Sequence, residues 1–403
     1  MRICFVQQHP VDEQKIPAAI LRWVTLLDKF RDAGHSVFAI GPNNRLKFEE
    51  REFRGVRQLL IPTPGTGIKS LDMLFFAAFL FPGMLIARKK FRIERWFVDE
   101  LFVCFGILFY RLFHPRDIIC YDVMGIHYYQ VKKNNRKLVR HFFLANLYGI
   151  MEYLTLFASS FVTTINLAHA EILREWSSKP CHVIRDAVDF SSATEKIADE
   201  LVLPKKRPGD IFLTFVGKIS NNRLDELYAI LLELMQRIPQ LKFIIIGDGP
   251  FTEKYKSWSV KLGLSERIIF VGFVPHSHLP THIGQADISY SDDWSDIGFP
   301  MKVFEYMAMG SAILVEKTPA VSELMADSYN CILYHGKQEL LDSVIKLCND
   351  ADLRTRIGEV AKVEAIEYHN WDDRLARFEN LYAYYAGEIG SELIEKKDLG
   401  YKN

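Results

Sequence analysis

Several features that would assign this sequence to a class of protein are missing from it. The six cysteines among 403 residues are scattered and form no C-x-x-C pair, which fits neither a zinc site nor a disulfide framework. A reducing cytosol is the expected compartment. The first ten residues, MRICFVQQHP, lack the long apolar segment and small-residue cleavage site of a signal peptide, so export is not expected.

Long apolar runs are also missing. The two longest are MLFFAAFLF at 73–81, which continues past Pro82 to Ala87, and LFVCFGILFYRLF at 101–113. Both are shorter than the roughly 20 residues of a membrane-spanning helix. The sequence therefore predicts no transmembrane helix.

Net charge is absent overall, but charge is unevenly distributed. Residues 1–200 hold 27 Lys and Arg against 21 Asp and Glu, and the remainder hold 23 against 29. Between Arg45 and Arg140 there are 18 basic and 9 acidic residues, and both apolar runs lie there. Basic residues beside exposed apolar surface suit a membrane-surface contact. Alternatively, both runs are helices buried against a sheet with a solvated basic rim. No nucleic-acid partner is expected.

What is present indicates two α/β domains. A content of 49% hydrophobic and 25% charged residues is that of a globular chain long enough for two cores. Apolar strands alternate with amphipathic helices from residue 1 to about 195, and the alternation restarts after a polar segment at 191–210. We expect Rossmann-like domains at 1–195 and 205–371, with a C-terminal helix in 372–403 that crosses back to the first domain.

Two such domains place a ligand cleft outside the carboxyl ends of their strands. Glycines mark three strand ends of the second domain: Gly217, Gly247 with Gly249, and Gly272. A glycine there lets the backbone approach a phosphate, but any domain of this class also needs tight turns. In FVGKISNNR, Lys218 and Arg223 place two cations near the first of these ends, where they can stabilise a departing diphosphate; alternatively, both are solvated.

The stretch GFPMKVFEYMAMGSAIL at 298–314 predicts a helix of about ten residues, because Pro300 suits its first turn and Gly310 the position after its end. Glu305 lies mid-helix among apolar residues, and a carboxylate there needs a partner. It can accept hydrogen bonds from a diol such as ribose. Alternatively, it forms a salt bridge, either within the helix, for example with Lys302, or with another helix.

These segments together resemble the retaining glycosyltransferases of family 4, which have the GT-B fold. The resemblance covers nearly the whole chain and is carried by FVGKISNNR, FIIIGDGP, IIFVGFVPHSHLPTHIGQADISYS, GFPMKVFEYMAMGSAIL, VIRDAVDF and NWDDRLARFENLY. It implies a cleft between two Rossmann-like domains, a nucleoside-diphosphate-sugar donor and no catalytic metal or other cofactor.

The resemblance also implies roles for individual residues. Lys218 and Arg223 would contact the donor diphosphate and act in catalysis, and Glu305 would hold the ribose. The donor-binding residues are expected to be Gly217, Lys218, Arg223, Gly247, Gly249, Asp296, Gly298, Phe299, Pro300, Met301, Lys302 and Glu305. The family usually carries a further glutamate eight positions before Glu305; here that position is Ile297, and Asp296 beside it is the candidate replacement.

In the first domain, the segment YDVMGIHYY resembles a family position that contacts the sugar or acceptor. Asp122 and His127 are the catalytic and acceptor-binding candidates, and His9 is a third acceptor-binding candidate. Asp122 and His127 can equally be a loop cap and a packed imidazole. The histidines of HSHLPTH are not expected to bind metal, because their spacing does not place His276, His278 and His282 on one helix face.

The leading hypothesis is a cytosolic enzyme, peripheral at the cytosolic face of a membrane, that transfers a sugar to a lipid-linked or glycan acceptor. A sugar-nucleotide epimerase of the same fold and a non-catalytic protein, either nucleotide-sugar-binding or a scaffold, are the alternatives. Conversion of a sugar nucleotide without acceptor would indicate the epimerase, and failure to bind any nucleoside diphosphate would indicate the scaffold.

Overall fold

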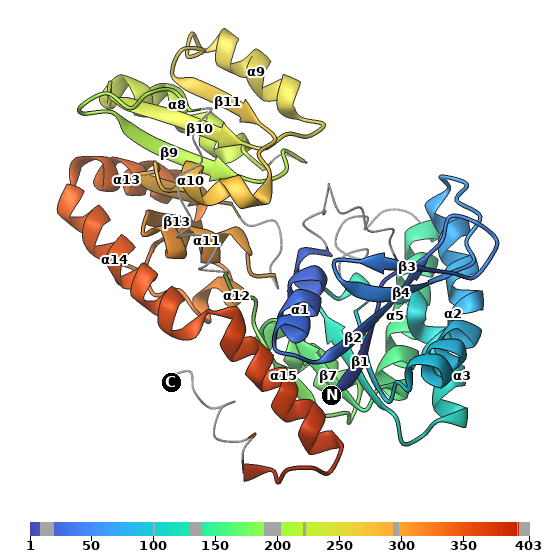
Figure 1. Cartoon of the computed structure of the whole chain (residues 1–403). Coiled ribbons are helices and arrows are strands. Elements are labelled where there is room, and N and C mark those ends of the chain that lie inside the picture. Colours follow the sequence, from blue (N-terminus) through green and yellow to red (C-terminus); the bar gives the residue numbers. More distant parts are fainter. Residues whose placement is uncertain are drawn as a thin grey trace. The chain divides into compact units, whose positions relative to one another are not determined.

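The computed structural model describes residues 1–8, 20–99, 101–128, 139–188, 203–220, 223–292, 298–392 and 394. It divides into two compact units, Met1–Arg185 with Asp372–Asn403, and Asp186–Trp371 (Figure 1). The division lies before the predicted linker, of which residues 191–202 are outside the described residues. The backbone N–H of Val188 donates to the carbonyl of His369 at 3.0 Å, which ties the chain after the division to the second unit.

The N-terminal unit contains an eight-stranded sheet in the order β3-β4-β2-β1-β5-β6-β7-β8. Its strands are β1 (Arg2–Val6), β2 (Ser36–Pro42), β3 (Glu49–Phe53), β4 (Val56–Ile61), β5 (Arg95–Val98), β6 (Ile118–Val123), β7 (Phe161–Thr164) and β8 (Cys181–Val183). All neighbours are parallel except β3 and β4. Its helices are α1 (Leu21–Asp32), α2 (Lys69–Phe91), α3 (Cys104–Phe113) after the 3-10 turn η2 (Leu101–Val103), α5 (Val139–Ala158), α6 (Leu167–Trp176) and α15 (Trp371–Tyr385).

The antiparallel hairpin of β3 and β4 was not predicted from the sequence. Arg54 and Gly55 connect the two strands, both with positive φ, 50° and 73°. A two-residue turn of that hand matches the twist of an antiparallel pair. The glycine at its second position was the local signal for it.

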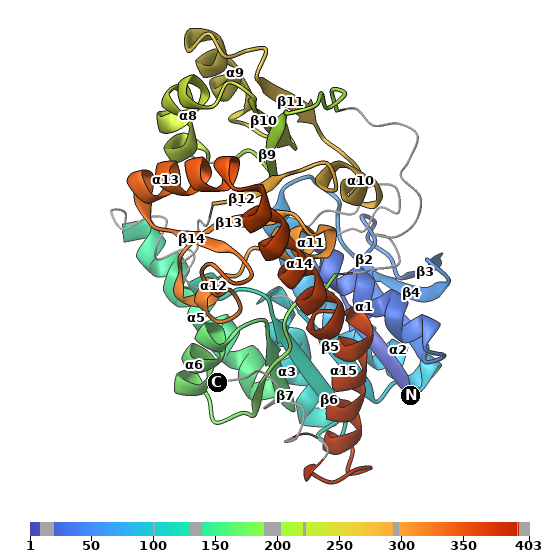
Figure 2. The ribbon, with the colours of Figure 1, turned by 90° about the vertical axis from the view of Figure 1, so that its left-hand side faces the viewer.

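Helices α1 and α15 cover one face of this sheet. Phe5 of β1 contacts Trp23 of α1, with ring centroids 6.0 Å apart, and Phe97 of β5 contacts Phe378 of α15 at 5.7 Å. The hydroxyl of Tyr382 donates to the carbonyl of Trp96 at 2.9 Å. Figure 2 shows α15 in red along these strands. The predicted return of the C-terminal helix to the first sheet is confirmed.

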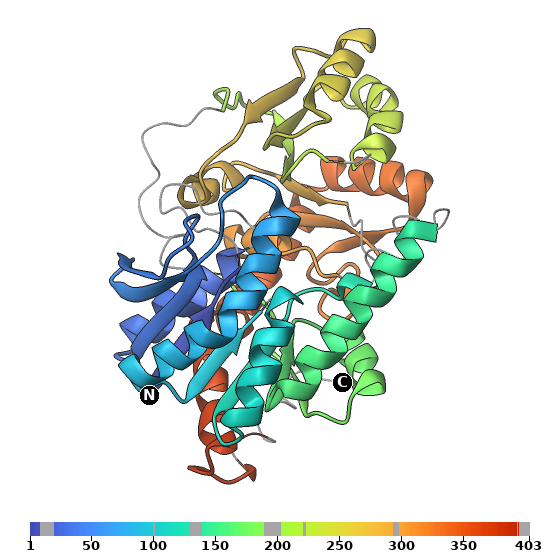
Figure 3. The ribbon, with the colours of Figure 1, turned by 90° about the vertical axis from the view of Figure 1, so that its right-hand side faces the viewer.

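Helices α2, α3 and α5 lie side by side on the other face (Figure 3). The core between these helices and the sheet contains Phe76, Leu80 and Met84 of α2, together with Ile107 and Tyr110 of α3. Among the described residues one segment, Leu71–Phe91, is long and apolar enough to cross a membrane, judged by length and composition alone. This helical segment is longer than the apolar run at 73–87 described from the sequence, so the expectation that the run is too short to span a membrane was wrong on length. Since one side of α2 packs in the core, it lies along the sheet.

The C-terminal unit contains a six-stranded parallel sheet in the order β11-β10-β9-β12-β13-β14. Its strands are β9 (Ile211–Val216), β10 (Leu241–Ile246), β11 (Ile268–Gly272), β12 (Ile288–Ser291), β13 (Ala312–Glu316) and β14 (Ile332–Tyr334). Its helices are α8 (Asp225–Arg237), α9 (Thr252–Lys261), α10 (Leu279–Ile283) after the 3-10 turn η3 (His276–His278), α11 (Lys302–Met309), α12 (Pro319–Ser322), α13 (Gly336–Asn349) and α14 (Ala351–Tyr368). Alternate residues of five strands enter two apolar clusters, one on each face, as expected of a doubly wound sheet. In β12 the second face carries the buried Ser289 and Ser291 instead.

A close backbone contact with α14 holds helix α11 in position. A Cβ atom on Gly358 would lie 2.0 Å from the carbonyl oxygen of Gly310, so only glycine fits there. Gly310 itself ends α11 with φ of 69°, the left-handed cap predicted from the sequence. This contact fixes the helix that carries Lys302 and Glu305.

Candidate functional site

The strand-end glycines are required by backbone packing. A Cβ atom on Gly247 would lie 2.0 Å from the carbonyl oxygen of Gly217, and one on Gly249 would lie 2.2 Å from that of Ile219. Gly217 and Gly247 also have φ of 145° and 131°. These contacts account for the glycines without a ligand, so their predicted donor contacts stay a prediction. They do bring the loops after β9 and β10 together.

Arg223 and Lys302 meet at one buried carboxylate, that of Asp292. The guanidinium Nε and Nη2 of Arg223 donate to Asp292 Oδ2 and Oδ1 at 2.8 and 2.9 Å. The ammonium Nζ of Lys302 lies 3.3 Å from Oδ1. Burial alone raises the pKa of Asp292, but the charges of Lys302 and Arg223 outweigh it and hold that pKa below its ordinary value. The three charged groups therefore carry a net charge of about +1 at neutral pH.

The ring of Phe215 lies beneath both cations. Lys302 Nζ is 4.1 Å from its centroid and Arg223 Cζ is 5.6 Å away. An aromatic face attracts cations, so this ring helps to hold them at the end of β9. Arg223 uses Nε and Nη2 on Asp292, which leaves Nη1 without a hydrogen-bond acceptor in the described part of the chain. One Arg223 donor is therefore available to an anion.

Lys218 directly follows Gly217, the glycine at the end of β9. Its side chain is exposed, and no residue that the structure describes pairs with its ammonium group. It is thus less constrained than Arg223, the other cation that we predicted to contact a diphosphate.

Tyr306 anchors α11 to the carboxyl ends of two strands. Its hydroxyl accepts from the backbone N–H of Val216 at 2.9 Å and donates to the carbonyl of Tyr290 at 3.2 Å. In the segment before the helix, the carbonyls of Pro300 and Met301 accept from the backbone N–H groups three residues further on, at 2.9 and 3.1 Å. Gly298 and Pro300 are partly buried.

Phe299 differs from its neighbours in that segment. Its side chain is buried, and its ring lies 4.8 Å from that of Phe304. The side chain therefore belongs to the core, and the predicted donor contact is limited to its backbone.

Glu305 is paired with a histidine from a different element. The carboxylate Oε1 of Glu305 lies 2.7 Å from Nε2 of His276, in the turn η3 that follows β11. The side chain of Glu305 is 22% exposed and that of His276 is 51% exposed. This pairing replaces the intrahelical pair with Lys302 that the sequence left open, and it leaves Glu305 accessible from solvent.

The other histidines of the HSHLPTH segment serve the turn itself. The Nδ1 atom of His282 lies 2.8 Å from the carbonyl oxygen of His278. Sequence reasoning considered this segment for metal only and missed the His276 contact with Glu305. It also assigned no role to Asp292. The available signal was position, because both residues follow the carboxyl end of a strand.

Asp122, in the N-terminal unit, is a buried structural residue. It is fully shielded from solvent and accepts hydrogen bonds from Arg22 Nε at 2.7 Å and Nη2 at 3.1 Å, and from Thr163 Oγ1 at 2.6 Å. Arg22 also donates to the carbonyl of Ile184. The expectation that Asp122 contacts a sugar or acceptor does not fit this geometry, because both carboxylate oxygens are already used in the core.

His127 is 37% exposed and is held by Glu152 of α5. The Oε1 atom of Glu152 accepts from the backbone N–H of His127 at 2.6 Å and lies 3.3 Å from its Nδ1. His127 stays a candidate acceptor contact. His9, Asp296 and Ile297 lie outside the described residues.

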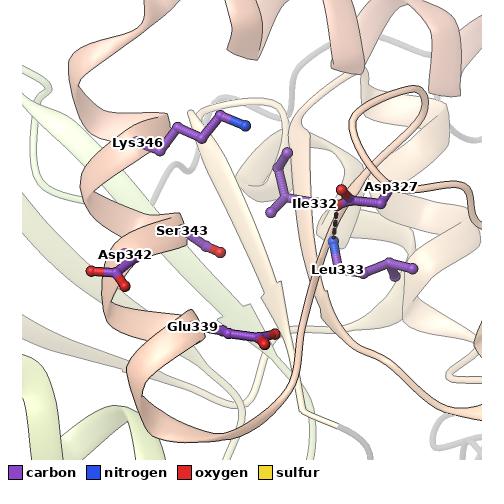
Figure 4. A pocket seen from close by; sticks show the side chains of 7 residues that line it. All are labelled: Asp327, Ile332, Leu333, Glu339, Asp342, Ser343 and Lys346. Atoms are coloured by element: carbon purple, nitrogen blue, oxygen red, sulfur yellow. Dashed lines mark hydrogen bonds between the residues drawn. The ribbon is translucent and has the colours of Figure 1, made fainter.

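A separate pocket of about 270 Å³ lies between β14 and α13 (Figure 4). It is lined by Asp327, Ile332, Leu333, Glu339, Asp342, Ser343 and Lys346. Asp327 Oδ1 accepts from the backbone N–H of Leu333 at 2.8 Å, which caps the edge strand β14. With three carboxylates and one ammonium, the lining suits no phosphate, and no residue predicted to bind the donor lies there.

Residues 199–364 match the sequence profile of the family described as glycosyl transferases group 1. The C-terminal unit is a group 1 glycosyltransferase domain. This group 1 domain contains the Arg223, Asp292 and Lys302 cluster, the Glu305 and His276 pair, and the exposed Lys218.

Two named enzymes are similar to part of this chain. The chain is 26% identical over 159 residues to alpha-D-kanosaminyltransferase of Streptomyces kanamyceticus, covering 38% of this chain and 41% of that protein. It is 24% identical over 165 residues to a GDP-mannose-dependent alpha-(1-6)-phosphatidylinositol monomannoside mannosyltransferase of Mycolicibacterium smegmatis, covering 39% and 43%. The matched region thus spans less than half of these relatives.

The fold of the whole chain is similar to that of sucrose-phosphate synthase from Thermosynechococcus elongatus. The TM-score is 0.77 at 14% identity, over 96% of this chain and all of that one. The fold is therefore GT-B, with two Rossmann-like units, as predicted.

Proposed function

We propose that the protein is a retaining glycosyltransferase that takes a sugar from a nucleoside-diphosphate donor. The group 1 domain supports this class of reaction. The observation that carries the proposal is the convergence of Arg223 and Lys302 on Asp292. Lys218, which follows the end of β9, adds an exposed cation. A net positive charge at strand carboxyl ends suits the diphosphate of a nucleotide sugar.

In the proposed reaction the bond between the sugar C1 and the diphosphate oxygen breaks, and a bond from an acceptor hydroxyl oxygen to C1 forms on the same side of the ring. The hydroxyl proton passes to the departing diphosphate. Negative charge develops on the departing diphosphate. Lys218, Lys302 and the unused Nη1 donor of Arg223 stabilise that charge, which is electrostatic stabilisation by groups already in place. Asp292 keeps two of the cations in position, and no catalytic metal is invoked.

Glu305 binds the ribose in this proposal. Its carboxylate is partly exposed and is fixed on a helix anchored by Tyr306, so it can accept hydrogen bonds from two ribose hydroxyls. The contact from His276 comes from a half-exposed side chain, and such pairs contribute little to stability. A ribose can therefore displace His276 at small cost.

The proposed acceptor is a lipid-linked molecule or glycan, reached by a protein that is peripheral at the cytosolic face of a membrane. The name of one relative specifies a phosphatidylinositol monomannoside acceptor and a GDP-mannose donor. The apolar helices of the N-terminal unit also support an acceptor with a lipid portion.

A panel of sugar nucleotides tests the proposal in two stages. The first stage measures thermal stabilisation, since a ligand that binds the native state raises the melting temperature. The second incubates the stabilising donor with a membrane lipid extract and determines by NMR the anomeric configuration of the product. A transferred sugar with retained configuration supports the proposal. Conversion of the donor without acceptor would indicate an epimerase, and no stabilisation by any donor would indicate a scaffold.

A further inference from the structure

The outward side of the three adjacent helices of the N-terminal unit is apolar (Figure 3). The exposed large apolar side chains there are Leu71, Leu74 and Ile86 of α2, Phe105, Phe109, Leu112 and Phe113 of α3, and Leu147, Ile150, Tyr153 and Phe157 of α5. We call this set the three-helix face. Contiguous exposed apolar surface of this kind marks an interaction site in a folded protein.

The spacing shows that this face is a regular feature of the helices. Phe105, Phe109 and Leu112 recur every three or four residues, which places them on one side of α3, whereas Ile107 and Tyr110 on its other side are in the core. A helix on the surface of a soluble domain normally turns a polar side to water. Here both sides are apolar: the inner side is buried in the protein core, and the outward side suits burial in another apolar environment.

Negative charge is nearly absent from these helices. α2, α3 and α5 together contain two acidic residues, Asp72 and Glu152. Glu152 is buried and holds the backbone N–H of His127, and Asp72 accepts hydrogen bonds from Thr66. Asp72 is therefore the one partly exposed carboxylate among the described residues of these helices.

Positive charge borders the face. Lys89 in the last turn of α2, Arg92 at its C-cap and Arg116 just after α3 are exposed, and none of the three has an ion-pair partner in the described part of the chain. Both helices lead into neighbouring parallel strands, so their C-terminal ends lie at the same edge of the sheet.

We propose that the three-helix face docks the protein on an anionic lipid bilayer. Apolar and aromatic side chains bordered by Lys and Arg are the composition of segments that lie in the interface of a membrane. The basic border matches the negative surface potential of anionic lipids. A second copy of the chain is the less suitable occupant, because it would bring another basic border of the same sign to this face. The helices lie along the bilayer, since their inner sides are fixed in the core.

Flotation with vesicles tests the docking, and the chain offers a matched control. Leu112 is 70% exposed on the three-helix face, and Val260 is 68% exposed on α9 of the other unit. Wild-type protein and Val260→Glu are expected to float with vesicles of phosphatidylcholine and phosphatidylglycerol at low salt. Leu112→Glu should lower the partition coefficient by about tenfold or more. Equal flotation of the two variants, or no flotation of wild type, would overturn the proposal.

A site-specific label locates the contact independently of binding strength. All six native cysteines are buried, so a cysteine introduced at position 112 or 260 is labelled selectively by an environment-sensitive fluorophore. On vesicles the label at Leu112→Cys should report an apolar environment, and the label at Val260→Cys should not. An apolar signal at position 112 without vesicles, with a dimer seen in sedimentation, would show that a second copy covers the face and would refute lipid docking.

The proposed docking and the proposed function can be refuted independently of each other. Nucleotide binding by Leu112→Glu should equal that of wild type, because position 112 lies outside the group 1 domain. Flotation without binding of any nucleoside diphosphate would support the docking while refuting the glycosyltransferase. Nucleotide binding without flotation would refute the docking and leave the proposed glycosyltransferase supported.

Discussion

Replacing Glu305 by alanine separates donor binding from folding. Two hydrogen bonds from ribose hydroxyls to a carboxylate contribute about 1.5 to 3 kcal/mol each at most, so the loss of both weakens binding by roughly 2 to 4 kcal/mol after imperfect geometry is allowed for. That is roughly thirty- to several-hundred-fold in Kd. The lost contact with His276 involves a half-exposed side chain and costs less than about 1 kcal/mol of folding free energy.

Calorimetric titration of the variant with the nucleoside diphosphate that binds wild type measures this effect, and the 2′,3′-dideoxy analogue supplies the matching chemical deletion. Wild type should bind the analogue as weakly as Glu305→Ala binds the natural ligand. The variant should bind the two ligands about equally. His276→Ala, which keeps the carboxylate, is the control and should bind close to wild type. If Glu305→Ala still discriminates the two ligands as strongly as wild type, the ribose assignment is wrong.

Three further substitutions test the geometry. Asp292→Asn leaves two cations without their counter-ion and should lower the free energy of unfolding by about 2 to 4 kcal/mol in denaturant titration; an unchanged midpoint would contradict the role given to this carboxylate. Gly247→Ala should cost more than about 3 kcal/mol, whereas Gly263→Ala, with positive φ but open space around it, should cost less; equal costs would contradict the packing argument. His169 is buried and burial lowers its pKa to about 4. In the unfolded chain its pKa is about 6.5, so the contribution of neutral His169 to the free energy of unfolding is complete above that pH. This contribution falls by roughly 2 kcal/mol between pH 7.5 and 5. His169→Leu should remove that loss from the pH dependence of the free energy of unfolding.

Periodicity and turn residues were sufficient to predict much of the fold. The alternation of apolar strands and amphipathic helices gave two parallel sheets, and Gly310 correctly placed the end of α11. The hairpin of β3 and β4 was missed because a single short antiparallel pair at a sheet edge interrupts that alternation. Its turn at Arg54 and Gly55 is a weak signal in a segment with many charges.

Side-chain partners were the part that the sequence did not reveal. Asp122 looked accessible at a strand end, but its partner Arg22 lies 100 residues away in sequence and covers it. Glu305 is likewise paired with His276, 29 residues earlier, because two loops meet at the same sheet edge. Position at a strand end can be predicted from periodicity, whereas the partner depends on packing between elements distant in the sequence.

The central claim is that the C-terminal unit binds a nucleoside diphosphate through the cations beside Asp292. Titration calorimetry of the whole protein with UDP, GDP, ADP and CDP tests it most directly. We expect one saturable site for at least one of them. Lys302→Gln should weaken binding there at least about tenfold, whereas Lys261→Gln, on the exposed side of α9, should leave it unchanged. Absence of saturable binding for all four, or equal binding by both lysine variants, would contradict it.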